Sequence, residues 1–139
     1  AENQSVGVRV SKWSIEGLGA NRDDTGVDIV VFRLADLHLM RAEAQLRLGS
    51  GDALADVNAV RVARGGSDFA KASATLEDVY DERGYEFYWE YHRRTDQIRF
   101  GTWEDAWTDK SDTDPNKRIY AIPPGPLAET PGLEQNPGY

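Results

Sequence analysis

Two short glycine-containing segments, Gly49–Gly51 and Gly65–Gly66, divide this chain into helical stretches, and their spacing limits the folds open to it. Gly49–Gly51 follows an apolar pattern over residues 32–48, and glycine readily takes the left-handed conformation that ends a helix. Asp52 is a suitable N-cap for a second helix over residues 53–64. Because the linker is so short, the two helices must be antiparallel neighbours. The sequence therefore predicts an αα-hairpin.

The first predicted helix is apolar on two sides. One stripe is formed by Leu34, Leu37, Ala44 and Leu48. Much of the remaining surface is filled by Ala35, Leu39, Met40, Ala42 and Leu46. A helix with this pattern is expected to pack on two sides, and its alanines permit close approach of a neighbouring helix.

A third helix is predicted over residues 76–100, and it should be the longest. Thr75 and Asp78 form an acidic variant of the capping box, and the helical spacing of apolar side chains continues to Phe100. Three aromatic residues inside this helix are interpreted as core: Tyr85, Tyr88 and Trp89. Gly101 then begins a loop.

The overall expectation is one all-α domain over residues 1–139. It contains a tetratricopeptide-like helix hairpin, one long helix, irregular loops and a Pro-rich C-terminal tail of at least 15 residues. Residues 1–27 form an irregular lead-in. The Pro-rich tail is expected to be extended and to be ordered by lying on the helices.

Charge and cysteine content exclude several functional classes. With 16 Lys and Arg against 24 Asp and Glu, the net charge is −8, which disfavours binding to nucleic acid or to an anionic membrane surface. The absence of cysteine excludes disulfides, thiolate zinc sites and a cysteine nucleophile. Because the chain shows neither an initiator methionine nor a signal sequence, we expect it to be a piece of a longer protein.

Three glutamates four residues apart stack on one side of the predicted long helix: Glu82, Glu86 and Glu90. Such like charges repel unless cations interleave, and Arg83, Arg93, Arg94 and Arg99 lie nearby in sequence. The cluster could be a carboxylate pair for acid–base chemistry or a di-metal site. We favour a structural ion-pair network that joins this helix to its neighbours.

No cofactor or metal is predicted. The chain has two histidines, His38 and His92, at unrelated positions, and no Glu-x-x-His pair. It also has no phosphate-binding glycine-rich loop and no dinucleotide-binding fingerprint.

Three tryptophans lie in segments predicted to be non-helical: Trp13, Trp103 and Trp107. Exposed tryptophan on a loop often marks a binding surface, and a flat indole can cover the apolar face of a sugar ring. Packing of the loops onto the helices is the alternative, and we favour it. If this chain contacts a glycan, these three residues are its leading candidates.

Four segments occur in a characteristic order. Phe32–Ala44 is similar to the pattern R-x-A-E-x-L-L-x-x-A-E-A, and Ala53–Arg61 to A-L-x-x-[LIV]-N-x-[LIV]-R. Glu82–Arg99 is similar to E-R-R-x-E-[FL]-x-x-E-G-x-R-x-x-D-L-x-R. Ile122 and Pro123 match P-I-P, and the ending Gln135–Tyr139 matches Q-N-P-G-Y. Together they resemble, over residues 28–139, the C-terminal portion of the SusD/RagB family of nutrient-binding lipoproteins.

The sequence also departs from the patterns of this family. Gly84 and Tyr91 stand where the family usually has arginine and glycine. Thr130–Gly132 replaces a common Asn-Pro. These changes alter the local ion-pair network and leave the resemblance in fold intact.

The resemblance implies a non-enzymatic protein of the outer membrane that binds glycan, or in some members peptide, at the cell surface. It would pass the nutrient to a SusC-like TonB-dependent transporter, and a lipid anchor is expected on an N-terminal part outside this chain. The matched motifs imply structure: a network of Glu82, Arg83, Glu86, Glu90, Arg93, Asp96 and Arg99, with the Pro-rich tail across the helices. The chain would be a mainly structural C-terminal piece.

Two other functions were weighed. A tetratricopeptide-like protein-interaction module would repeat after about 34 residues, but this shift places Ala44 and Gly49 on Asp78 and Arg83, so no repeat is present. A helical glycoside hydrolase would need two carboxylates opposed across a cleft. The stacked glutamates instead lie on one predicted helix.

Overall fold

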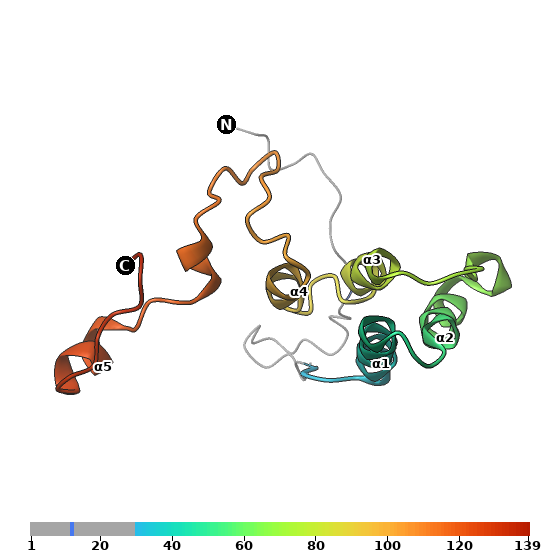
Figure 1. The fold of residues 1–139 in the computed structure, drawn as a ribbon, viewed down its shortest axis with the longest axis horizontal. Helices are drawn as coiled ribbons and strands as arrows, with labels where there is room; N and C mark the ends of the chain where they lie inside the picture. Colours follow the sequence, from blue (N-terminus) through green and yellow to red (C-terminus); the bar gives the residue numbers. More distant parts are fainter. Residues whose placement is uncertain (1–11, 13–29) are drawn as a thin grey trace, which may run out of the picture.

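The computed structural model describes Lys12 and residues 30–139; Trp13 and the rest of the predicted lead-in lie outside the described residues (Figure 1). Every regular element in the described part is a helix, which confirms the all-α prediction. An isolated bridge between Trp107 and Lys110 is the one extended pairing there. No helix in this part of the chain is long and apolar enough to cross a membrane.

The predicted αα-hairpin is present, as α1 (Leu34–Leu48) and α2 (Ala53–Gly65). Gly49 ends α1 with φ 64°, and the Asp52 side chain caps α2 by accepting a hydrogen bond from the Ala55 amide at 3.0 Å. The first helix starts two residues later than predicted, because Arg33 is extended at its N-cap. A short 3₁₀ turn, η1 (Ser67–Phe69), follows α2.

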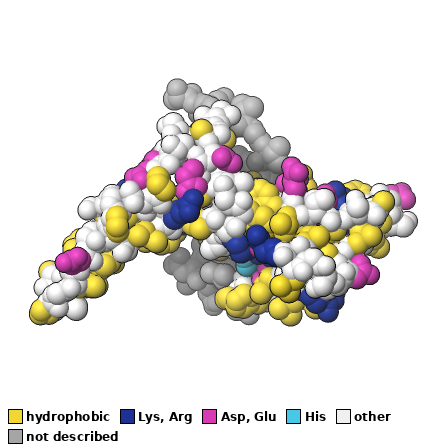
Figure 2. All heavy atoms as spheres, viewed as in Figure 1, with side chains coloured by type: hydrophobic (Ala, Val, Ile, Leu, Met, Phe, Trp, Pro, Cys, Tyr) yellow, Lys and Arg dark blue, Asp and Glu magenta, His cyan; other side chains and the backbone are white. Residues whose placement is uncertain are grey.

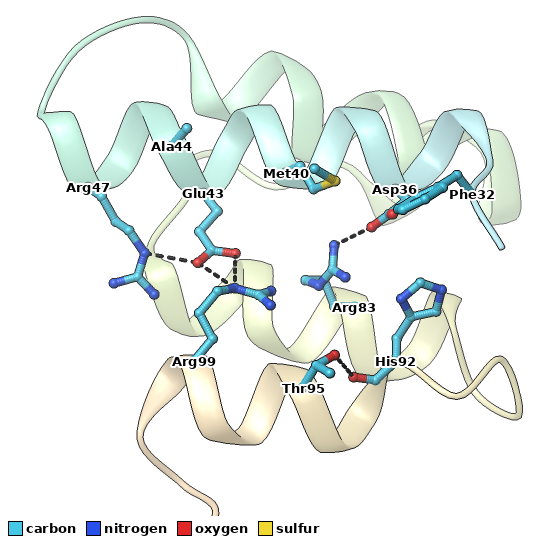
Figure 3. A pocket seen from close by; sticks show the side chains of 10 residues that line it. All are labelled: Phe32, Asp36, Met40, Glu43, Ala44, Arg47, Arg83, His92, Thr95 and Arg99. Carbon is cyan, nitrogen blue, oxygen red and sulfur yellow. Dashed lines mark hydrogen bonds and ion pairs between the residues drawn. The ribbon is translucent and has the colours of Figure 1, made fainter. Parts of the chain in front are cut away.

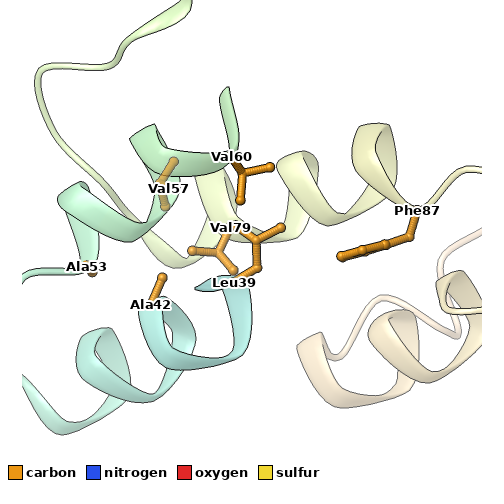
Figure 4. Packing of buried hydrophobic residues seen from close by; sticks show 7 residues of the cluster. All are labelled: Leu39, Ala42, Ala53, Val57, Val60, Val79 and Phe87. Atoms are coloured by element: carbon orange, nitrogen blue, oxygen red, sulfur yellow. The ribbon is translucent and has the colours of Figure 1, made fainter. Parts of the chain in front are cut away.

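A small apolar core joins this hairpin to α3 (Leu76–Glu86) (Figure 4). Its buried members are Leu39, Ala42, Ala53, Val57, Val60, Val79 and Phe87. Within the described residues α1 is therefore packed on one side, against α2 and α3. Leu34, Leu37 and Leu48 on its other side are exposed, so the expectation of two-sided packing is not met there.

The predicted single helix over residues 76–100 is wrong, because the chain turns between α3 and α4 (Arg93–Phe100). The capping box of Thr75 and Asp78 does begin α3, as predicted. In the turn, Trp89 and Tyr91 have φ of 63° and 64°, in the left-handed region that disfavours such side chains. The turn brings the Phe87 ring into the core.

The aromatic residues that were expected in the core lie on the surface instead. Tyr85, Tyr88 and Trp89 are 72%, 58% and 60% exposed. The helical pattern failed here because the apolar side of α3 is supplied by Val79 and Phe87, and the turn carries Tyr88 and Trp89 outward. Tyr91, at the end of the same turn, is also exposed.

The C-terminal tail, residues 101–139, does not lie across the helices as predicted. It projects from α4 as an arm (Figure 1) and contains a 3₁₀ turn, η2 (Pro115–Arg118), and a short helix, α5 (Pro124–Glu129). No residue of the arm is buried. Its link to α4 is Arg94, which donates hydrogen bonds to the carbonyls of Lys117 and Arg118 at 2.6 and 3.0 Å.

The arm is ordered by its own last residues. The Gln135 side chain accepts a hydrogen bond from the Ile122 amide at 2.8 Å and donates one to the Ile122 carbonyl at 3.0 Å. Asn136 donates to the Tyr120 carbonyl at 2.8 Å, and the Tyr139 hydroxyl donates to the Ile119 carbonyl at 2.8 Å. The ending Gln135–Tyr139 thus clips onto residues 119–122 by side-chain to main-chain bonds.

Candidate functional site

Arg83 is a buried arginine at the centre of an ion-pair network between α1, α3 and α4. Its guanidinium donates to Asp36 of α1 at 2.7 Å and to Asp96 of α4 at 2.9 Å. The side chains of all three residues are at most 4% exposed. Since three helices contribute one residue each, Arg83 fixes their relative positions.

A second part of the network surrounds the end of α3. Arg33 donates to both carboxylate oxygens of Glu90, at 2.8 and 2.9 Å, and also contacts the Glu86 carboxylate. Arg64 of α2 donates to Glu86 at 2.9 Å, and Lys12 contacts Glu90. Burial raises the pKa of the Glu86 and Glu90 carboxyls, but the hydrogen bonds from these cations outweigh it and hold both pKa values below the ordinary range.

A third part joins α1 to α4 (Figure 3). Arg99 donates to Glu43 at 2.9 Å and to Asp96 at 2.7 Å, while Arg47 donates to Glu43 at 2.9 Å. Burial raises the pKa of the Glu43 carboxyl, and the bonds from Arg99 and Arg47 lower it further than burial raises it. Glu82 contacts Arg61 of α2.

Arg93 departs from the predicted network. It is exposed and forms no ion pair with any described residue. It instead donates to the Tyr80 carbonyl at 3.1 Å and stacks its guanidinium 3.8 Å from the centre of the Tyr80 ring. The sequence overlooked Arg33, Asp36 and Glu43, which contribute from α1 and its N-cap. All three residues lie within the Phe32–Ala44 segment that is similar to the family pattern, and this could have identified them.

The geometry does not favour acid–base chemistry at the stacked glutamates. Glu82 is bound by Arg61, Glu86 by Arg33 and Arg64, and Glu90 by Arg33. The hydrogen bonds that lower the pKa values of Glu86 and Glu90 keep these two carboxylates ionised near neutral pH, so neither can act as a general acid there. Among the described residues, no three His, Asp or Glu side chains gather as metal ligands do.

An aromatic hollow lies at the turn between α3 and α4. Four exposed rings, from Tyr85, Tyr88, Trp89 and Tyr91, line it together with Tyr120 of the arm. Its volume is about 830 Å³, within the usual size of small-ligand sites. Arg93, Arg94 and Asp81 add polar groups at its edge. The sequence did not predict this hollow. The one feature that could have indicated it is Tyr91, an aromatic residue at a position where the family usually has glycine.

The two described tryptophans of the predicted site lie at the base of the arm. Trp103 is half-buried: the Arg94 guanidinium lies 4.3 Å and the Lys110 ammonium 5.2 Å from the centre of its ring. Trp107 is 49% exposed, with Lys110 4.6 Å from its ring centre. Thus Trp103 packs the arm against α4, while Trp107 keeps open surface. Hydrophobic side chains also lie along the arm in Figure 2.

Comparison with known proteins gives consistent matches. The whole chain, residues 1–139, matches the SusD family. It is 34% identical to the starch-binding protein SusD of Bacteroides thetaiotaomicron, covering 81% of this chain and 22% of that protein. It is 33% identical to the SusD-like protein P25 of Formosa agariphila, covering 90% of this chain and 25% of that protein. The chain thus spans about a quarter of the length of these relatives.

Proposed function

Because the chain belongs to the SusD family, we propose that the full-length protein binds glycan nutrients at the cell surface without altering them chemically. One relative is named for binding starch, which supports a glycan ligand. The structural observation that carries the proposal is the group of exposed aromatic rings at the α3–α4 turn. Flat rings that face solvent offer the C–H faces of sugars an apolar partner.

Backbone strain at the turn supports a role for these rings in binding. Trp89 and Tyr91 both hold left-handed backbone conformations, which cost roughly 1–2 kcal/mol for such residues. Within the described residues, neither ring recovers this cost by burial, because Trp89 and Tyr91 are 60% and 84% exposed. Strain that packing does not explain is typical of ligand-binding positions.

The rest of the proposal follows the family. We place the protein at the outer membrane, held there by a lipid anchor outside this chain, and expect it to hand its ligand to a SusC-like TonB-dependent transporter. Within the 139 residues, the Arg83 network serves structure, and the described part is mainly a scaffold. Trp107 is a second candidate ligand contact at the base of the arm, with Trp103 and Trp13 behind it.

Titration of the full-length protein tests both the ligand class and the site. Isothermal calorimetry would use maltoheptaose, cellohexaose and xylohexaose as probes. Loss of a stacking ring costs about 1 kcal/mol, or roughly fivefold in Kd. We expect Trp89→Ala to bind the glycan roughly fivefold more weakly than the wild type. Trp107→Ala should show the same loss of affinity if the base of the arm also contacts the sugar.

Trp103→Ala is compared with these variants: because Trp103 is half-buried and the Arg94 guanidinium lies 4.3 Å from its ring centre, we expect it to lose less affinity than Trp89→Ala. If the wild type bound no glycan of a broader panel either, the ligand class would be wrong. Binding that is unchanged in Trp89→Ala and in Trp107→Ala would keep the function and move the site out of this part of the protein.

A further inference from the structure

Two arginines at the aromatic hollow between α3 and α4 have no carboxylate partner. Arg93 and Arg94 both line this hollow, and neither forms an ion pair with a described residue. Every other arginine in the described part of the chain is paired with a carboxylate. Since acidic groups are in excess in a chain of net charge −8, the lack of a partner at this one hollow calls for a reason.

Arg94 is accounted for by the arm. It donates hydrogen bonds to the carbonyls of Lys117 and Arg118 at 2.6 and 3.0 Å. Its guanidinium lies 4.3 Å from the ring centre of Trp103 and 4.4 Å from that of Tyr120. These contacts hold the arm on α4 and bring the Tyr120 ring to the hollow. They leave the positive charge of Arg94 in place, because carbonyls and rings carry no net charge.

Arg93 is held in a defined position, and one edge of its guanidinium stays free. Its Nη1 donates to the Tyr80 carbonyl at 3.1 Å, and the guanidinium lies 3.8 Å from the centre of the Tyr80 ring. That ring is itself fixed by a hydrogen bond to Thr102 at 2.6 Å. The Nε and Nη2 groups of Arg93 form no hydrogen bond with any described residue, and the side chain is exposed. This free edge is one on which two parallel N–H groups can bind a carboxylate.

Gly84 of α3 makes room for this guanidinium. A Cβ atom at position 84 would lie 3.0 Å from Nη1 of Arg93 and 3.4 Å from its guanidinium carbon, closer than most such contacts in proteins. Glycine inside a helix is less favourable than alanine. The residue at position 84 thus favours the position of Arg93 at the expense of the helix.

The groups around the hollow suit a sugar that carries a carboxylate. The exposed rings offer apolar partners to the C–H faces of a sugar ring. The free edge of Arg93 matches a planar anion. Asp81, which also lines the hollow, can accept hydrogen bonds from hydroxyls and repels a second carboxylate. The acid of the sugar would therefore point toward Arg93 and away from Asp81.

We propose that the hollow binds an acidic glycan, and that Arg93 binds the carboxylate of a uronic acid unit through its Nε and Nη2 groups. This inference rests on the proposed glycan-binding function and specifies the class of glycan. The negative charge of the rest of the chain does not prevent such binding. Charges farther away than about 8 Å are largely screened at physiological salt, so the groups at the hollow decide the preference.

Calorimetric titration of the full-length protein tests the inference. The probes are hexagalacturonate and hexamannuronate, each compared with its methyl ester, which keeps the sugar rings and removes their charge. Hydrogen bonds to a charged group are stronger than those to a neutral one. We expect the wild type to bind one of the acids roughly tenfold more tightly than its ester.

Arg93→Gln should bind that acid roughly tenfold more weakly than the wild type and bind the ester equally well. Arg93→Lys keeps the charge but loses the fork of N–H groups, so its affinity should be intermediate. The matched control is Arg41→Gln, which also removes one exposed arginine charge. Arg41 is bonded to Asp56 on α2 and does not line the hollow. This variant should bind the acid as the wild type does.

Salt gives a second measurement, which needs no variant. Raising NaCl from about 50 to about 300 mM should weaken binding of the acid by the wild type and leave binding of the ester unchanged. Equal salt dependence for acid and ester would overturn the inference. This comparison keeps the inference testable if Arg93→Gln does not fold.

The outcomes separate this inference from the proposed function. Binding of neutral glycans without a preference for either acid would overturn the inference and leave the function standing. Acid binding that is unchanged in Arg93→Gln would do the same, and would indicate that a carboxylate elsewhere in the polypeptide is the partner of Arg93. If no glycan bound, neutral or acidic, the proposed function would be wrong and the inference with it.

Discussion

Arg33 donates a hydrogen bond from its Nη2 to the main-chain carbonyl of Glu86 at 2.7 Å, at the last residue of α3. In a continuing helix this carbonyl would accept from the amide of Glu90. That amide bonds instead to the Phe87 carbonyl, at 2.9 Å. A side chain from the N-cap of α1, together with Lys12, which donates to the same carbonyl at 2.6 Å, thus satisfies the backbone group that the turn leaves free. Arg33 binds the Glu90 carboxylate as well.

Replacing Arg83 should destabilise the protein strongly. In Arg83→Ala, the buried Asp36 and Asp96 lose their shared cation, and breaking a buried pair in this way costs about 3–5 kcal/mol. Urea unfolding of the full-length protein, followed by circular dichroism, measures this change. Arg93→Ala is the matched control: its guanidinium is exposed and stacks on Tyr80, so the loss should stay below about 1 kcal/mol. Equal losses in the two variants would contradict the central role of Arg83.

The strain at Tyr91 gives a prediction about backbone rather than side chain. Tyr91→Ala and Tyr91→Gly both remove the exposed ring, but only glycine adopts the φ of 64° without steric cost. We expect the glycine variant to be the more stable of the two by about 1 kcal/mol. Thermal unfolding compares them. Alanine and glycine variants of equal stability would show that the turn relaxes when the ring is removed.

Local signals in the sequence were enough to predict the hairpin, and long-range partners explain what was missed. Gly49 and Asp52 act within a few residues of the helices that they end and begin. The carbonyl freed at the end of α3 is bound by Arg33 and Lys12, which lie 53 and 74 residues from Glu86. Since no glycine or proline stands at the turn, periodicity alone favoured a continuous helix.

The candidate site was hidden for the same reason. Rings at positions 85 and 88 share the spacing of a helix face, so they were interpreted as core. Only the turn at residues 87–91 shows that they point to solvent. The arm was misjudged in a different way, because its prolines indicated an extended tail and gave no sign that Gln135 would bind Ile122.

The stability of the protein should fall in acid. The folded state holds the pKa values of Glu43, Glu86 and Glu90 below their ordinary range, which is about 4.3 in an unfolded chain. The unfolded state therefore binds protons first as the pH falls. This contribution is complete above about pH 5.5 and is lost progressively below the unfolded pKa.

Urea unfolding between pH 3 and 7 would measure this dependence. Glu90→Gln should be less stable at pH 7, because Arg33 loses a charged partner. It should also lose less stability on acidification than the wild type does, because one titrating group is gone. Parallel stability curves for the two proteins, or a wild type that becomes more stable in acid, would contradict the assignment.

The clip of the arm should open without affecting the helical core. Gln135→Ala removes the partner of both the amide and the carbonyl of Ile122, and each lost hydrogen bond costs about 0.5–1.5 kcal/mol. Because no residue of the arm is buried, we expect the unfolding of α1–α3 to be unchanged, while hydrogen exchange at the Ile122 amide accelerates about tenfold. Gln135→Glu separates the two bonds, since its carboxylate still accepts from the amide but repels the carbonyl, and it should give an intermediate exchange rate. Unchanged exchange at Ile122 in Gln135→Ala would mean that Asn136 and Tyr139 hold the arm by themselves through the carbonyls of Tyr120 and Ile119.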